Sequence, residues 1–235
     1  MKAVILCAGY ATRLYPLTLD RPKPLLPIRN RAVLDYIIDR LPKSVNKTFV
    51  VSTDKFYKDF LEWGKDKKEV TILNDGTSTN ETRLGGIGDL WLAIEKEKID
   101  EDILVILGDN LFDFNLDEFS EFAAKINETA IGVCEVNGDD IRKFGVVEIS
   151  GSKIVSFEEK PEKPRSNLAS TGIYFFTRKD LARIRDYMKT NEPKDGPGYL
   201  IKYFYARYGV HAFALKGRWF DIGSKETYYK LNETW

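Results

Sequence analysis

The chain has 235 residues, of which 36 are basic and 36 are acidic, so its formal charge at pH 7 is zero. This length suffices for one sizeable α/β core, and the balanced charge gives no reason to expect nucleic acid or an anionic membrane as a partner. Its apolar runs fall short of the ~18 residues that a membrane span requires, and the short apolar N-terminus lacks the features of a signal peptide. We therefore expect a cytoplasmic protein.

Aliphatic runs alternate with amphipathic segments through the first half of the chain. The runs are nearly continuous, as in parallel strands covered on both faces, and span residues 3–7, 48–52, 70–73 and 103–107. The amphipathic segments carry apolar residues at helical spacing and span 33–41, 90–98 and 116–126. This alternation predicts a βαβ sheet with right-handed crossovers.

The second half has shorter strand-like runs, at 145–149, 153–158 and 170–177. A hairpin is predicted around residues 150–152, where a Gly-Ser turn separates VVEIS from KIVSF. Two helices, a strand and a last helix follow at 178–190, 197–208, 210–215 and from 224 onward. We expect this half to lie over the first as a lid or second lobe.

Three residues that often carry chemistry are expected to be structural. Cys7 and Cys134 lie in apolar runs, which is typical of buried, reduced thiols rather than of a disulfide framework. His211, the only histidine, also lies in an apolar run, so neither a Ser/His/Asp nor a Cys/His arrangement is supported.

The segment LCAGYATRLYPLTLDRPKPLLP, residues 6–27, carries the strongest signal for chemistry. Small residues after a predicted strand leave backbone N–H groups open to a phosphate, and two cations, Arg13 and Lys23, follow. Cations beside an amide-lined loop suit a triphosphate, whose charge must be neutralised before attack. The structural alternative is a strand-to-helix turn with surface cations. Neither the Walker pattern nor the dinucleotide pattern GxGxxG is present in this segment.

This segment resembles the signature of the sugar-1-phosphate nucleotidylyltransferase family, approximately GxGTRLxPxT followed by a Lys-Pro pair. The matching residues are Gly9, Thr12, Arg13, Leu14, Pro16, Thr18, Lys23 and Pro24. Ala11 stands where the family usually has Gly, and Ala restricts a backbone with positive φ. The resemblance implies a Rossmann-like three-layer α/β/α fold with a mostly parallel, mixed central sheet, of the nucleotide-diphospho-sugar transferase type.

Residues 81–94, ETRLGGIGDLWLAI, place a glycine-rich turn before a predicted helix, where backbone groups can contact a ligand edge. An ordinary glycine turn is the alternative. The segment resembles the LGTAG-type stretch with which the family reads the nucleotide base. Leu84, Gly85 and Gly88 match it, whereas the residues that depart from it are Gly86, Ile87 and Asp89. These departures leave the identity of the base open.

Two aspartates occupy positions suited to a metal ion. Asp109 ends the run ILVILGDN at the carboxyl end of a predicted strand, where open α/β sheets bind ligands. Asp221 lies in RWFDIGSKETY, just before a predicted helix. Each could instead cap the element that follows. Both segments resemble family motifs, GDN and W-x-D-x-G-[ST], and the resemblance implies that the two carboxylates hold Mg²⁺, which accepts oxygen ligands.

The stretch SFEEKP, residues 156–161, is by itself a charged hairpin end. It resembles the family's EEKP motif, in which the Lys binds the phosphate of the sugar 1-phosphate and the Glu contacts sugar hydroxyls. The resemblance gives these roles to Lys160 and Glu159. It also implies sugar-side contacts at Gly145, Thr171 and Gly172.

The resemblance implies an ordered displacement with Mg²⁺ as the cofactor. The implied catalytic residues are Arg13, Lys23, Asp109, Lys160 and Asp221. The implied nucleotide contacts are Leu6, Ala8, Gly9, Thr12, Arg13, Lys23, Gly85 and Gly88. The acceptor phosphate attacks the α-phosphorus in line, and pyrophosphate leaves. Because that phosphate is already ionised near neutral pH, no general base is needed.

We expect a single nucleotidyltransferase domain over 1–235, with an NTP-binding half at 1–130 and a sugar-phosphate-binding half at 131–235. The C-terminal β-helix domain that many relatives carry is not expected. The partners would be an NTP and a sugar 1-phosphate, with glucose 1-phosphate as the default. A homo-oligomer stays open, because relatives often assemble.

Other functions remain open at this point. A cytidylyltransferase acting on inositol phosphate or phosphocholine would use the same motifs. A glycosyltransferase would normally show a D-x-D motif after a strand, and the stretch from Asp109 to Leu111 is not one. A non-catalytic nucleotide or sugar-phosphate-binding protein is a further alternative.

Overall fold

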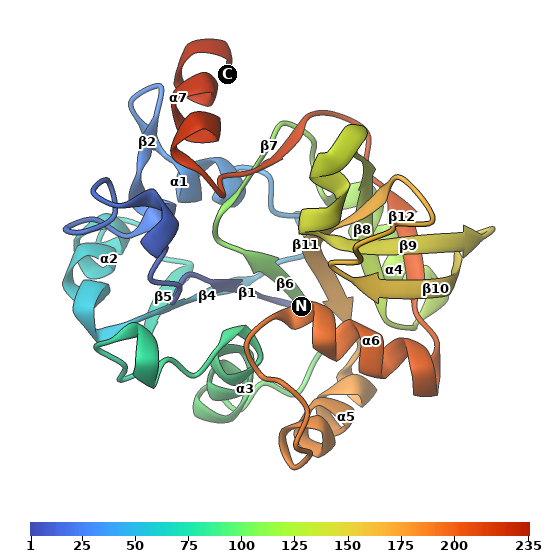
Figure 1. Ribbon diagram of the computed structural model, residues 1–235. Coiled ribbons are helices and arrows are strands. Elements are labelled where there is room, and N and C mark those ends of the chain that lie inside the picture. The colour runs from blue at the N-terminus through green and yellow to red at the C-terminus, as the bar shows by residue number, and fades with distance from the viewer.

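Nine strands form a single sheet in the computed structural model, which describes residues 1–235 apart from the side chain of Asp139 (Figure 1). The first half of the chain supplies β1 (Lys2–Leu6), β4 (Lys47–Ser52), β5 (Val70–Asn74) and β6 (Ile103–Leu107). β1 pairs in parallel with β4 and β6, and β5 pairs in parallel with β4. These are the four strands that the apolar runs predict.

The second half of the chain continues this sheet. Its strands are β8 (Ala130–Glu135), β9 (Gly145–Ser150), β10 (Lys153–Glu159), β11 (Leu168–Phe176) and β12 (His211–Ala214). The full order is β5-β4-β1-β6-β11-β8-β12-β10-β9, and β11 runs antiparallel to both β6 and β8. The expected lid over the first half is therefore wrong. The apolar β11 is buried along almost its whole length, and a place inside the sheet covers both of its faces.

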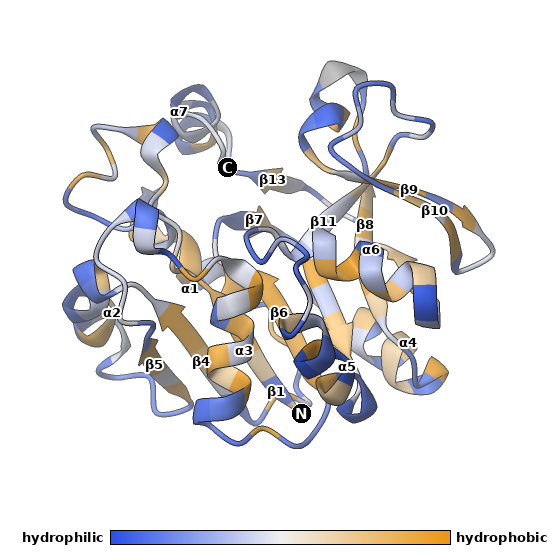
Figure 2. Cartoon of the chain, turned by 60° about the horizontal axis from the view of Figure 1, so that its bottom comes forward, coloured by the Kyte–Doolittle hydropathy of each residue, from blue (hydrophilic) through white to orange (hydrophobic). Residues whose placement is uncertain are grey.

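Helices cover both faces of the sheet (Figure 1). One face carries α3 (Gly86–Lys96), α5 (Arg178–Met188) and α6 (Pro197–Tyr208). The other carries α1 (Val33–Ile38), α2 (Tyr57–Gly64) and α4 (Asp117–Ile126). Neighbouring side chains of β1 point to opposite faces, so Val4 packs in the first core and Ile5 in the second. Figure 2 shows the hydrophobic strands between these helices, and the predicted three-layer α/β/α fold is confirmed.

Short elements complete the chain. The hairpin of β9 and β10 forms as predicted, with Lys153 opposite Ser150 across a Gly-Ser turn. Two small sheets pair β2 (Pro27–Ile28) with β3 (Arg31–Ala32), and β7 (Asn110–Phe112) with β13 (Trp219–Asp221). The last helix, α7 (Lys225–Thr234), begins after Ser224, whose hydroxyl accepts the backbone N–H of Thr227 at 3.2 Å.

The residues expected to be structural lie within the fold. Cys7 and Cys134 are free and buried, and burial raises the pKa of the Cys134 thiol to about 12. The His211 ring contacts Ser152 and Glu128, each at 3.0 Å, and so joins the start of β12 to its surroundings. None of the helices among the described residues has the length and apolar character needed to cross a lipid bilayer.

Candidate active site

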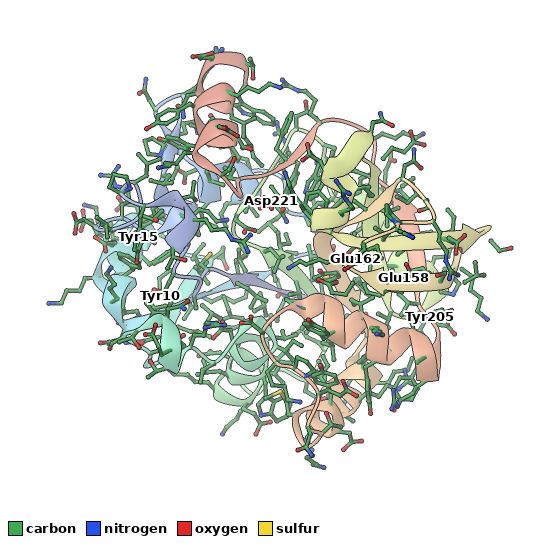
Figure 3. The ribbon with its side chains drawn as sticks, in the orientation of Figure 1. Tyr10, Tyr15, Glu158, Glu162, Tyr205 and Asp221 are labelled. Atoms are coloured by element: carbon green, nitrogen blue, oxygen red, sulfur yellow. The ribbon has the colours of Figure 1, made fainter. Side chains whose placement is uncertain are left out.

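A cavity of about 920 Å³ lies at the carboxyl ends of β1 and β6. Both halves of the chain line it, including the loop after β1, the bend between β6 and β7, the end of β10 and the first turn of α6. Figure 3 labels Asp221 near the centre of the molecule, between the N-terminal segments and the β9–β10 hairpin that carries Glu158. This is the edge at which open α/β sheets bind ligands.

The loop after β1 reaches the cavity through Ala11, Thr12 and Arg13. Ala11 adopts the left-handed conformation, with φ 48° and ψ 42°, and its carbonyl accepts the hydroxyl of Thr18 at 2.9 Å. A residue with a Cβ atom is disfavoured in that conformation by about 1–2 kcal/mol, which explains why the family motif has glycine at this position.

The short β7–β13 sheet brings the two predicted metal-ligand residues together. Asp221 lies opposite Asn110 in this pairing and therefore beside Asp109, and the N–H of Ile222 donates to the carbonyl of Asp109 at 3.2 Å. The ammonium of Lys23 donates to Asp109 Oδ2 at 2.8 Å and to the carbonyl of Ile222 at 2.9 Å. It also lies 4.0 Å from Asp221 Oδ1, so one cation contacts both carboxylates.

The pKa values follow from this arrangement. Burial and the negative charge of Asp109 raise the pKa of Asp221 to about 6, against the lowering effect of Lys23, Lys160 and Arg13. Burial by itself would lower the pKa of Lys23, but the charges of the two carboxylates outweigh it and raise that pKa. Two carboxylates in a partly buried site thus require a cation between them.

The same pair of carboxylates fits a divalent metal ion. Both reach one ammonium, so their oxygens converge on a space that a small cation can share or take over. Mg²⁺ in phosphate-transferring sites commonly uses one or two carboxylates and completes its shell with phosphates and water. Within the part of the chain that the structure describes, no group of three or more His, Cys, Asp or Glu forms a metal site. Two converging carboxylates suit a metal that is bound together with a phosphorylated substrate.

The opposite wall of the cavity carries the predicted acceptor residues. Glu159 ends β10 opposite Gly145 of β9, and Lys160 follows in a left-handed conformation with φ 49°. The backbone N–H of Lys160 donates to the carbonyl of Phe144 at 3.1 Å, while its side chain is 64% exposed. Burial raises the pKa of Glu159, although the charge of Lys160 opposes this rise. Strained backbone at a non-glycine residue often accompanies a functional role.

A bulge in β11 shapes the floor of the cavity. Its register shifts between Ser170 and Tyr174, and Gly172 takes a positive φ of 76°. A Cβ atom on Gly172 would lie 2.7 Å from Leu107 Cδ1, so only glycine fits there. The hydroxyl of Thr171 donates to the carbonyl of Gly132 at 2.9 Å. Thr171 thus lines the cavity, but its hydroxyl already donates a hydrogen bond within the fold.

Asn110 is a site residue that the sequence analysis did not select. Its side-chain amide donates to the carbonyl of Thr171 at 2.7 Å, and its Oδ1 accepts the indole N–H of Trp219 at 3.2 Å. Trp219 in turn meets Phe144 edge to face, with ring centroids 5.0 Å apart. The GDN motif contains this residue, so its position next to Asp109 was the available signal.

Five predicted nucleotide contacts do not line the cavity: Leu6, Ala8, Gly9, Gly85 and Gly88. The turn that contains Gly85 is occupied by the chain itself, because Gly86 N–H donates to the carbonyl of Asp195 at 2.7 Å. Ile87 N–H likewise donates to the carbonyl of Lys194 at 3.0 Å. The binding role of these five residues stays a prediction.

A buried acidic pair lies outside the cavity, between the end of β5 and α3. Asp89 is 4% exposed, and burial together with the charge of Asp75 raises its pKa to about 8. Asp75 accepts the backbone N–H of Thr77 at 2.7 Å, and the Thr77 hydroxyl lies 3.2 Å from that of Tyr10. The pair therefore carries a proton at neutral pH.

These features define a class of α/β protein with a cavity lined by charged residues at the carboxyl ends of parallel strands, where such sheets bind ligands. The family model described as nucleotidyl transferase matches residues 2–235, and the chain belongs to that family. A solved structure of a proposed glucose-1-phosphate thymidylyltransferase from Bacillus anthracis has the same fold, with a TM-score of 0.82 at 24% identity. That match covers 99% of this chain and 94% of the other.

Curated relatives are longer than this chain. Bifunctional protein GlmU from Methanocaldococcus jannaschii is 34% identical over 227 residues, which is 95% of this chain and 51% of that protein. Glucose-1-phosphate adenylyltransferase from Clostridium novyi is 30% identical over 254 residues, which is 99% of this chain and 66% of that protein. The chain thus spans about half the length of the first relative and 66% of the length of the second.

Proposed function

We propose that the protein transfers an NMP unit from an NTP to a sugar 1-phosphate and releases pyrophosphate. One observation carries this proposal: a single cavity joins the Lys23, Asp109 and Asp221 cluster to the wall that bears Glu159 and Lys160. A nucleotide and a phosphorylated acceptor can therefore meet in one space. Glucose 1-phosphate is the default acceptor.

The residues of the chain supply position and charge. Arg13 and Lys23 neutralise the phosphates of the NTP, and Lys160 holds the acceptor phosphate on the opposite wall. An acceptor oxygen forms a bond to the α-phosphorus while the bond to the β-phosphate oxygen breaks, so pyrophosphate leaves. The second ionisation of a phosphate monoester has a pKa of about 6, so the nucleophile needs no general base.

Asp109 and Asp221 would hold Mg²⁺ in this reaction. A bound divalent ion neutralises the charge that develops on the phosphate oxygens. Lys23, whose ammonium lies against both carboxylates, would remain beside the metal and could contact a phosphate there. We also propose that residues 1–130 bind the NTP and that residues 131–235 bind the acceptor. Asp221 is then the one residue of the second half that contributes to the metal site. We propose a cytoplasmic location for the protein.

The nucleotide base and the acceptor must be identified by experiment. Relatives bear names that specify adenylyl and thymidylyl transfer, so similarity alone does not select a base. We would measure Mg²⁺-dependent pyrophosphate release with every NTP and dTTP, crossed with sugar 1-phosphates, inositol phosphate and phosphocholine. Release with one pair identifies both substrates, and cytidylyl transfer to inositol phosphate or phosphocholine is one such result. Nucleotide binding without release from any pair would contradict the proposal and favour a binding protein.

A further inference from the structure

The first turn of α6 lies against the carboxylate of Glu159. A Cβ atom placed on Gly198 would lie 2.6 Å from Cδ of Glu159 and closer still to its Oε2. Real Cβ atoms essentially never approach another atom within 3.0 Å, so an alanine at this position and the present Glu159 side chain exclude each other. The carboxylate occupies the space that a side chain on residue 198 would fill.

A second glycine confines the same carboxylate from the hairpin. A Cβ atom on Gly145 would lie 3.1 Å from Glu159 Oε2. The side chain of Glu159 is 14% exposed, and among the described residues it pairs only with the ammonium of Lys160, at 4.0 Å. Glu159 is thus fixed by its steric surroundings more than by hydrogen bonds of the fold, which leaves its oxygens available to a ligand.

The start of α6 is held in place and cannot easily move away from Glu159. Beyond the two N–H bonds from the Gly86–Ile87 turn, Arg83 Nε donates to Asp195 Oδ1 at 2.9 Å. A Cβ atom on Gly86 would also lie only 3.0 Å from Cδ of Pro197, so the backbones pack closely. A methyl group on residue 198 would therefore displace the flexible Glu159 side chain rather than the helix.

We propose that Gly198 is a positioning residue for the acceptor: it leaves the space in which the Glu159 carboxylate lies, and so sets the cavity to accept hydroxyl groups of a polyol phosphate. The inference rests on the proposed function. A carboxylate at that place accepts hydrogen bonds from ring hydroxyls, whereas a displaced carboxylate leaves those donors unpaired. An unpaired buried hydroxyl weakens binding strongly, so the position of one carboxylate can select the acceptor.

The test compares Gly198→Ala with Gly196→Ala. A Cβ atom on Gly196 would meet nothing closer than Tyr199 Cδ2 at 3.8 Å, so this variant adds the same methyl group without touching Glu159. With glucose 1-phosphate and the NTP that the wild type uses, Gly198→Ala should raise the acceptor KM about tenfold. The NTP KM should change less than about twofold in either variant, and the acceptor KM of Gly196→Ala should equal that of the wild type.

Two double variants separate positioning from a general defect. In a Glu159→Ala background, adding Gly198→Ala should leave the acceptor KM unchanged, because no carboxylate remains to be displaced. Glu159→Asp, which is shorter by one methylene, should recover part of the acceptor affinity lost in Gly198→Ala. Equal rises in the two KM values, or an effect that persists without Glu159, would overturn the proposal.

A folding defect of Gly198→Ala and a failure of the proposed function give different results. Should Gly198→Ala fail to fold, the double variant with Glu159→Ala must fold, since the clash is then removed; failure of both would also overturn the inference. Absence of turnover in the wild type contradicts the proposed function instead. Binding of glucose 1-phosphate, measured by calorimetry, then replaces the KM, and equal binding by Gly198→Ala and the wild type would contradict the positioning role.

Discussion

The two walls of the cavity differ in how their charges are compensated. On the proposed nucleotide side, the Lys23 side chain is only 14% exposed and contacts both Asp109 and Asp221. On the proposed acceptor side, the Lys160 side chain is 64% exposed and its ammonium lies 4.0 Å from Glu159. The charges of the first wall pair with one another and must exchange partners when ligands bind, whereas the second wall has an exposed cation beside a largely buried carboxylate. We therefore expect substitutions on the two walls to have different kinetic signatures.

The largest effect should come from the carboxylates of the nucleotide side. Asp109→Ala or Asp221→Ala removes a partner of Lys23 and one oxygen donor for a metal, so kcat should fall by about 10³-fold or more. Turnover and thermal unfolding would be measured on the same preparations. Asp39→Ala, which breaks the exposed 2.6 Å ion pair with Arg31, is the matched control. Full activity in either site variant would remove the metal assignment.

A smaller and more selective effect is expected on the acceptor side. Lys160→Ala removes an exposed cation, so it should raise the acceptor KM by about 10- to 100-fold and leave the NTP KM nearly unchanged. Its side chain is mostly exposed, so the free energy of unfolding should change by less than about 0.5 kcal/mol. Steady-state kinetics with each substrate varied in turn would measure this. An unchanged dependence on the acceptor would defeat the role assigned to Lys160.

The smallest effect concerns stability and lies outside the cavity. The pKa of Asp89 is raised from 3.8 to about 8, so between these values the folded state holds a proton that the unfolded state releases. The contribution of this group to stability therefore decreases as pH rises from about 4 to 8. Asp89→Asn should remove that dependence, so the variant should gain stability relative to the wild type as the pH rises from 5 to 8.

Urea unfolding at pH 5 and pH 8 would measure this change. The exposed Asp59→Asn is the control, because its carboxylate lies on the solvent side of α2. If Asp89→Asn loses as much stability between pH 5 and pH 8 as the wild type does, another group causes the pH dependence.

Local patterns predicted most strands of the main sheet and most helices, because a strand that is buried on both faces has a continuous apolar run, such as the one in β6. The strand β8 was not predicted, although its residues are mostly apolar. The position of β11 could not be predicted in this way. Its place between β6 and β8 depends on pairings between distant residues, for which the sequence has no local signal. The helix α2 was not predicted because Phe60 is its only buried residue, so its sequence lacks a clear apolar stripe at helical spacing.

The motifs selected several residues that line one cavity, but they did not predict its geometry. Asp109 and Asp221 were selected separately, and their meeting depends on β7 and β13, each only three residues long and too short to recognise. The glycine-rich turn at Gly85 has the composition of a ligand site, yet its N–H groups bind the carbonyls of residues 194 and 195. Gly198 carries no side chain, so only its surroundings reveal its relation to Glu159.

The central claim is that one cavity brings a nucleotide and a phosphorylated acceptor together. The most direct test is the rate of pyrophosphate release from the preferred NTP in the presence and absence of the acceptor, with Mg²⁺ at a fixed concentration. We expect pyrophosphate release that requires the acceptor and equals the amount of nucleotide-activated product formed. Release at the same rate without an acceptor, or product without pyrophosphate, would contradict it.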